Sequence, residues 1–102
     1  MDRMQNTRDK VEGWLKLYQS RIGTLTKLNR VEEPSYSITA WFETPEYLID
    51  ICAWDHACCL NIEAFNKSTE KADFYVEGPC ASDAELIPRL EGFLHWIESK
   101  KP

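Results

Sequence analysis

The sequence predicts an α+β fold, a two-layer sandwich in which an antiparallel meander of four to five strands is covered on one face by an N-terminal and a C-terminal helix. Apolar and polar side chains alternate through four consecutive segments of residues 35–77, and this period of two is typical of half-buried strands. Before and after this stretch, apolar residues recur at three- and four-residue spacing, as they do in amphipathic helices. The order helix, sheet, helix favours two layers, and 102 residues suffice for a single domain around one core.

The first predicted helix covers about residues 4–22. Its apolar residues lie three or four positions apart and are Val11, Trp14, Leu15, Tyr18 and Ile22. Gly23 is well placed to end this helix. Residues 24–31 show a weaker alternation and predict an edge strand, in which the charges of Lys27 and Arg30 discourage further pairing.

The meander follows as strands at about residues 35–43, 47–54, 58–65 and 70–77. Turns near residues 44–45, 55–56 and 66–69 set the predicted register. They pair Ala40 with Ile49, Phe42 with Tyr47, Ala53 with Cys58, Ile51 with Leu60, Ile49 with Ile62, Ala64 with Ala72 and Ile62 with Phe74. Apolar side chains meet at every second position in this register, so all three connections predict the same buried face.

The last predicted helix covers about residues 83–99. Ser82 and Glu85 form a capping-box pattern at its start. Its buried stripe consists of Leu86, Leu90, Phe93 and Ile97, supported by Ile87 and Leu94. Pro88 lies inside it, and because proline removes a helical hydrogen bond we expect a kink near the first turns or a later start.

The other face of the sheet is left open by two helices on one side. The alternation places on it Trp41, Leu48, Asp50, Cys52, Trp54, Cys59, Asn61, Glu63, Phe65, Asp73, Tyr75 and Glu77. Aromatic side chains among acidic ones on an uncovered sheet are typical of a polar-rimmed protein interface. Aromatic residues also favour strands in general, so a solvated sheet without a partner is an equal alternative on the residues alone.

Acidic residues are concentrated where the sheet is. Residues 43–85 contain ten acidic and two basic side chains, whereas the remaining 59 residues contain seven acidic and ten basic ones. Such a field repels nucleic acid and speeds association with a basic protein. We therefore expect a basic protein partner and no direct binding of nucleic acid.

The cysteines and histidines predict no catalytic site, no metal site and no cofactor. The segment Cys52-x-x-x-His56-x-Cys58-Cys59 resembles a zinc motif, but adjacent residues of a strand point to opposite faces, which opposes a tetrahedral site. Cys52 and Cys59 lie opposite each other in the predicted register, so a disulfide under oxidising conditions stays an alternative. An enzyme or small-molecule site that uses Cys52, His56 or Cys59 is a further alternative.

The sequence has no apolar run near the roughly 20 residues that a membrane helix needs. Its first residues, MDRMQNTRDK, lack the apolar core of a secretory signal. The absence of Cys-x-x-Cys pairs agrees with a reducing compartment. We therefore expect a cytoplasmic protein without a membrane partner, either a monomer or a weak dimer.

Residues 47–65, YLIDICAWDHACCLNIEAF, combine a hairpin that has a Trp-Asp turn with an alternating Cys-Leu-Asn-Ile-Glu strand. This pattern resembles bacterial immunity proteins of contact-dependent growth inhibition and other polymorphic toxin systems, and it is most similar to the TriTu family. The likeness includes the amphipathic first helix and a last helix that closes the core with Leu90, Phe93 and Ile97. It spans most of the chain.

The resemblance implies a non-enzymatic antitoxin that binds the C-terminal toxin domain of its own system and covers the active site. Many such toxins are nucleases, and their basic substrate clefts suit an acidic partner. The face and charge of the residues then select the partner-binding set: Asp50, Asp55, Glu63, Asp73 and Glu77 for basic side chains, and Trp41, Trp54 and Tyr75 as anchors. A cytosolic secretion chaperone that binds an effector segment is the alternative function.

Overall fold

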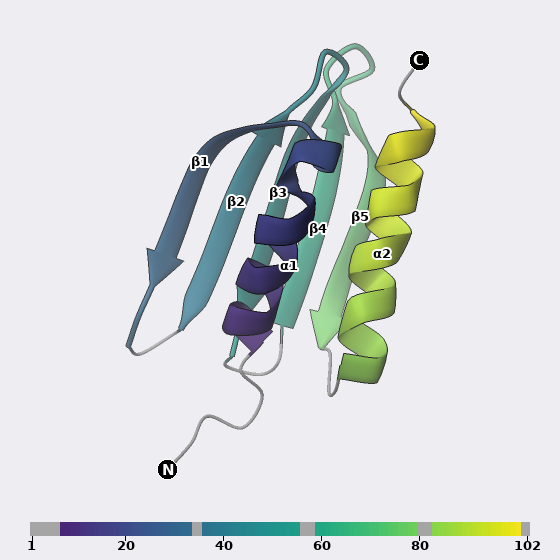
Figure 1. The fold of residues 1–102 in the computed structure, drawn as a ribbon. Coiled ribbons are helices and arrows are strands. Elements are labelled where there is room, and N and C mark those ends of the chain that lie inside the picture. Colours follow the sequence, from purple (N-terminus) through teal and green to yellow (C-terminus); the bar gives the residue numbers. More distant parts are fainter. Residues whose placement is uncertain (1–6, 34–35, 56–58, 80–82, 101–102) are drawn as a thin grey trace.

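The computed structural model describes residues 7–33, 36–55, 59–79 and 83–100, and it contains one antiparallel five-stranded sheet with two helices. The elements are α1 (Thr7–Ile22), β1 (Thr24–Val31), β2 (Ser37–Glu43), β3 (Tyr47–Trp54), β4 (Cys59–Asn66), β5 (Lys71–Pro79) and α2 (Asp83–Ser99). The strands lie in the order β1-β2-β3-β4-β5, and both helices cover the same face (Figure 1). The predicted α+β sandwich with one open sheet face is confirmed.

The core fills the space between the sheet and the helices. Its strand residues alternate as predicted, and Ile38, Ile51 and Ile62 are completely buried. From the helices, Val11 and Leu90 are buried equally deeply. Each such aliphatic side chain stabilises the fold by about 1.5–3 kcal/mol when it leaves water. An aromatic cluster extends this core under α2, where the rings of Phe74 and Phe93, Phe74 and Trp96, and Tyr47 and Trp96 lie 5.1–5.2 Å apart.

The element boundaries agree with the predicted ones closely. β1, β3 and α2 have the predicted bounds, β2 ends at Glu43 as predicted, and β4 and β5 end one and two residues later than predicted. The predicted first residues of β2 and β4, at positions 35 and 58, lie outside the described residues. The described part of α1 begins at Thr7, and the predicted start near residue 4 lies outside the described residues. The predicted capping serine, Ser82, also lies outside them.

Gly23 joins α1 to β1 where the chain passes close to the β2–β3 turn. The helix ends at Ile22, as predicted. A Cβ atom at position 23 would lie 2.9 Å from Cγ2 of Thr44 and 3.0 Å from the carbonyl oxygen of Glu43. Contacts this short are rare for real Cβ atoms, so glycine allows the close approach between the two backbones.

The predicted register was wrong by two residues at all three turns of the meander. Ala40 pairs with Ile51 rather than Ile49, and Ile51 pairs with Ile62 rather than Leu60. Ile62 pairs with Val76 rather than Phe74. This shift alone moves no side chain to the other face, because a shift of two preserves parity. The β2–β3 turn explains one shift: Thr44 donates its amide to the Tyr47 carbonyl at 2.9 Å, so the turn is centred on Pro45 and Glu46, one residue later than predicted.

The corrected register also separates the two cysteines that were predicted to face each other. Cys52 pairs with Asn61, and Cys59 pairs with Trp54. The predicted opposition of Cys52 and Cys59 is therefore wrong. Its cause is the β3–β4 connection, which has four residues between the strand ends instead of a two-residue turn.

A β-bulge in β5 overturns the predicted face of Asp73. Ala64 pairs with Phe74 whereas Phe65 pairs with Ala72, so Asp73 is the extra residue and the alternation restarts there. Its carboxylate accepts a hydrogen bond of 3.0 Å from the hydroxyl of Tyr47, a core residue. Asp73 therefore lies toward the helix-covered side and not on the open face.

Pro88 is accommodated inside α2, which runs from Asp83 to Ser99. The helix does not start after the proline, so the prediction of a later start was wrong. A proline inside a helix costs about 3 kcal/mol. Burial of Leu86, Leu90 and Phe93 on the same helix outweighs that cost.

Candidate protein interface on the open face of the sheet

One row of side chains crosses all five strands on the open face. In strand order it consists of Lys27, Trp41, Asp50, Glu63 and Tyr75, each of them paired with the next across neighbouring strands. Four of these five residues were predicted site residues. The four predicted site residues of the row, from Trp41 to Tyr75, are spread over 34 positions of the sequence, and the sheet brings them into one line.

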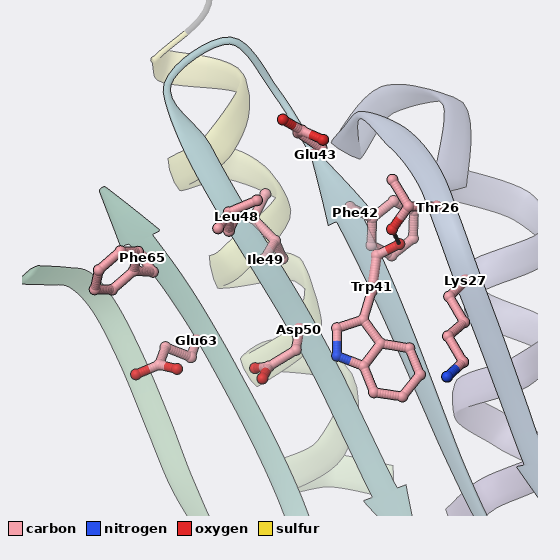
Figure 2. Close-up of a pocket in the computed structure, with 10 residues that line it drawn as sticks. All are labelled: Thr26, Lys27, Trp41, Phe42, Glu43, Leu48, Ile49, Asp50, Glu63 and Phe65. Atoms are coloured by element: carbon pink, nitrogen blue, oxygen red, sulfur yellow. Dashed lines mark hydrogen bonds between the residues drawn. The ribbon is translucent and has the colours of Figure 1, made fainter. Parts of the chain in front are cut away.

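A hollow of about 530 Å³ lies on this face between the row and the β2–β3 turn (Figure 2). Its side chains come from β1 to β4 and include Lys27, Trp41, Leu48, Asp50, Glu63 and Phe65. Twisted sheets are not flat, and large aromatic side chains raise the rim of such a surface. The hollow thus combines apolar walls with the carboxylates of Asp50, Glu63 and Glu43, of which Glu43 forms an ion pair with Lys67.

Asp50 and Glu63 are directly opposite each other on β3 and β4. Burial raises the pKa of the Asp50 carboxyl above its ordinary value, and the negative charge of Glu63 raises it further, while a backbone contact with Glu63 opposes the shift. Like charges directly across a strand pair destabilise the pair. Within the described residues no basic side chain forms an ion pair with either carboxylate.

Lys27 lies on the other side of Trp41 from Asp50 (Figure 2). Its ammonium nitrogen is 5.2 Å from the centre of the indole ring, a cation–π contact. Lys27 was not among the predicted residues of this face, because a bulge at Thr26 shifts the parity of β1. A weakly alternating edge strand gives no signal for that bulge.

The open face exposes large apolar residues. Leu48, which lines the hollow, is 47% exposed, and Tyr75 on β5 is 54% exposed, although leucine is usually buried. The Tyr75 hydroxyl donates a hydrogen bond to Glu77, and Glu77 pairs with Asn61 on the open face. Trp54, at the end of β3, is half-buried. Six of the eight predicted partner-binding residues therefore share the open face: Trp41, Asp50, Trp54, Glu63, Tyr75 and Glu77.

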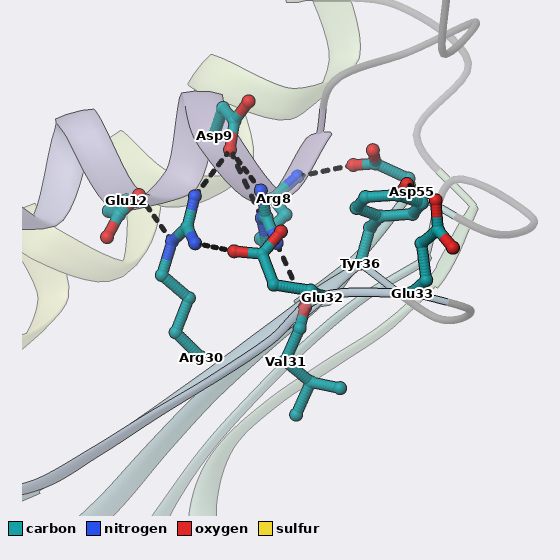
Figure 3. A network of polar contacts seen from close by, with 9 residues as sticks. All are labelled: Arg8, Asp9, Glu12, Arg30, Val31, Glu32, Glu33, Tyr36 and Asp55. Carbon is teal, nitrogen blue, oxygen red and sulfur yellow. Dashed lines mark hydrogen bonds and ion pairs between the residues drawn. The ribbon is translucent and has the colours of Figure 1, made fainter.

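Asp55 serves the fold at the end of the sheet. Its carboxylate accepts a hydrogen bond of 2.8 Å from the backbone amide of Arg8, in the first turn of α1 (Figure 3). A carboxylate at this position satisfies an otherwise unpaired amide and stabilises the positive end of the helix dipole. This contact gives Asp55 a structural role, and a role in partner binding stays a prediction.

Arg8 itself is only 2% exposed and joins α1 to the β1–β2 connection (Figure 3). Its guanidinium donates to the Val31 carbonyl at 2.9 Å, to Glu32 at 3.1 Å and to Asp9 at 3.0 Å. It also lies 5.4 Å from the centre of the Tyr36 ring. A buried arginine is stable only with such partners, and periodicity does not reveal it.

Cys52 lies on the open face beside the central row. Its thiol and the Thr39 hydroxyl are 3.0 Å apart. Burial raises the pKa of the Cys52 thiol. The hydrogen bond with Thr39 lowers this pKa by a smaller amount, and the negative charge of Asp50 adds a still smaller increase. A raised pKa keeps the sulfur protonated, which makes it a poor nucleophile or metal ligand. His56 and Cys58, and the side chain of Cys59, lie outside the described residues.

Among the residues that the structure describes, no three His, Cys, Asp or Glu side chains are grouped as metal ligands would be. Neither helix, within its described residues, has the length and apolar character needed to cross a bilayer. Comparison of the sequence with known protein families finds no match, and comparison with curated proteins finds none either.

Proposed function

We propose that this protein is a non-enzymatic immunity protein, which binds a basic toxin domain through the open face of its sheet. The single observation that carries the proposal is the row of acidic and aromatic side chains on β2 to β5, together with the hollow that this row borders. The resemblance of residues 47–65 to the immunity proteins of polymorphic toxin systems supports it. The toxin is a nuclease in this proposal, and binding takes place in the cytoplasm.

The acidic side chains supply attraction, and the aromatic ones supply buried contact area. Asp50, Glu63 and Glu77 give the face a negative charge, whereas Trp41 and Tyr75 offer large surfaces that a partner can remove from water. Interfaces obtain most of their binding energy from a few such anchors, and complementary charge accelerates the encounter. A nuclease cleft that binds phosphates is basic and matches this surface.

The connectivity of the sheet supports an immunity protein over the alternative of a secretion chaperone. Such chaperones typically have a helix inserted between strands of the sheet. Here the described strands β1 to β5 follow one another in sequence and in space. A chaperone would also bind an extended effector segment, usually as a dimer.

The proposal predicts a toxin gene immediately upstream, and binding to the C-terminal domain that this gene encodes is the test. Reversing Asp50, Glu63 and Glu77 to lysine should abolish growth protection in cells and weaken binding to the purified toxin domain at least tenfold. The association rate of the wild-type pair should fall as salt rises, since exposed charges are screened beyond about 8 Å at physiological ionic strength.

The matched control reverses exposed acids elsewhere, at Glu46, Glu70 and Glu91. This variant has the same net charge as the first, so equal losses of protection in both would assign the effect to overall charge and not to the open face. Unchanged toxin binding in the first variant would refute the open face as the interface. A dimer that binds an unfolded effector segment, and no toxin domain, would instead establish the chaperone.

A further inference from the structure

The central row of the open face lacks a cation at the place where its negative charge is greatest. Asp50 and Glu63 are adjacent across β3 and β4 and both line the hollow (Figure 2). Their mutual repulsion and the partial burial of Asp50 both disfavour two negative charges at this place. A positive group between them would remove the repulsion.

The chain supplies a cation one position away, on the other side of an aromatic ring. Lys27 lies against the Trp41 indole at 5.2 Å, and Trp41 pairs directly with Asp50. From β1 to β4 the row therefore contains a cation (Lys27), an aromatic ring (Trp41) and two carboxylates (Asp50 and Glu63). A cation lies on one side of the ring, and the two carboxylates on its other side have no cation between them.

The walls of the hollow indicate what kind of side chain carries that cation. Leu48 and Phe65 pair with each other across β3 and β4 and line the hollow next to the acids. An arginine has an apolar stem that packs against such walls and a planar head that stacks on aromatic rings. Its five N–H donors also allow hydrogen bonds to two carboxylates at once, which the single ammonium group of lysine satisfies less well.

We propose that one arginine side chain of the toxin domain enters this hollow and bridges the carboxylates of Asp50 and Glu63, with its stem against Leu48 and Phe65. The inference rests on the proposed function for the identity of the partner. The arginine belongs to a folded protein and not to a free small molecule, because the hollow lies in an exposed sheet face with apolar residues around it. A folded partner covers such a surface better than a small molecule does.

A peptide titration tests the hollow without the toxin. The probe is acetyl-Gly-Gly-Arg-Gly-Gly-amide, and the readout is the shift of backbone and indole amide signals in nitrogen-15 NMR spectra at low salt. Shifts should be largest at Trp41, Asp50, Glu63 and Phe65. The same peptide with citrulline, a neutral analogue of arginine, should bind at least fivefold more weakly, and a lysine peptide should lie between them.

Substitutions then identify the carboxylates. The double variant Asp50→Asn/Glu63→Gln removes both charges with little change of shape and should reduce binding of the arginine peptide at least tenfold. The matched control Glu46→Gln/Glu91→Gln, which has the same net charge and lies outside the hollow, should change it less than twofold. Thermal unfolding of both variants checks that they are folded.

Several results would overturn the inference. These are equal shifts with the citrulline peptide, equal binding by a leucine peptide, or unchanged binding in the Asp50→Asn/Glu63→Gln variant. If the toxin domain binds and the arginine peptide leaves the hollow unshifted, the arginine inference is wrong and the immunity function stands. If the peptide binds in the hollow and no toxin domain does, the pocket stands and the immunity function is wrong.

Discussion

The Tyr47 hydroxyl donates a hydrogen bond of 3.0 Å to the carboxylate of Asp73, on the side of the sheet that the helices cover. The Asn66 amide donates a second one to the same oxygen at 2.9 Å. The hydrogen bond from Asn66 lowers the pKa of Asp73 most, and the hydrogen bond from Tyr47 lowers it further, so this pKa lies below its ordinary value. Asp50, on the open face, has a raised pKa instead. Two acids that the sequence placed together therefore contribute to stability with opposite signs.

Replacing Asp73 by alanine should destabilise the protein at neutral pH. The carboxylate stabilises the fold while it is charged, because its native pKa is lower than its unfolded pKa. That contribution is complete above the ordinary aspartate pKa near 4 and is lost as the pH falls through the native pKa. The melting temperature of Asp73→Ala should therefore lie below that of the wild type at pH 7, and the difference should shrink at pH 3. An equal difference at both pH values would contradict a charge-dependent role.

Replacing Asp50 by asparagine should stabilise the protein slightly and weaken partner binding. A native pKa raised above the unfolded one means that the charged carboxylate disfavours folding at neutral pH, and that this penalty disappears as the pH falls below the ordinary aspartate pKa. The gain should be below about 1 kcal/mol, since the group is partly exposed and screened. Chemical unfolding at pH 7 measures it. A loss of stability would show that Asp50 serves the fold.

Tyr47→Phe should remove the hydrogen bond to Asp73 while the ring stays packed against Trp96. We expect a loss of about 1 kcal/mol at pH 7. Burial, followed by the hydrogen bond to Asp73, raises the pKa of Tyr47 to about 12. The wild type should therefore lose stability as the pH rises from about 10, where an unfolded tyrosine ionises, toward 12. Denaturant unfolding from pH 9 to pH 12 should show a smaller decline for Tyr47→Phe than for the wild type.

Asp55→Ala should cost about 1–2 kcal/mol in the free energy of unfolding, which is typical of losing a carboxylate at a helix start. The Arg8 amide then loses its acceptor at 2.8 Å. Asp55→Asn keeps a side-chain oxygen and should recover most of the loss, as measured by urea unfolding. If both variants unfold like the wild type yet fail to bind the toxin domain, Asp55 belongs to the interface and not to the helix start.

Parity made the faces of the central strands predictable from sequence. The apolar alternation of β2, β3 and β4 determines which side chains are buried, and Ile38, Ile51 and Ile62 lie where it predicts. Pairing partners were less predictable, because a shift of two residues preserves every face and only turn geometry separates the alternatives. The hydrogen bond between Thr44 and Tyr47 decides one of them, and no periodicity encodes it.

The site was predictable as a face but not in its details. The alternation identified Asp50, Glu63 and Trp41 as outward residues. Bulges in the two edge strands removed Asp73 from that face and added Lys27 to it. The burial of Arg8 was hidden as well, since it depends on backbone and carboxylate partners from a distant connection.

Because of the two bulges, the edge strands β1 and β5 tolerate the loss of one residue at a position where the central strands do not. Deletion of Thr26 would make Leu25 and Lys27 neighbours in sequence, and these two residues already lie on opposite faces of the sheet. Deletion of Asp73 would do the same for Ala72 and Phe74. In both cases the remaining side chains of the strand keep their faces. Removing one residue from β3 would move every later side chain of that strand to the opposite face. Deletion of either bulge residue is therefore compatible with the faces of its edge strand, whereas deletion of a residue inside β3 is incompatible with the faces of that strand.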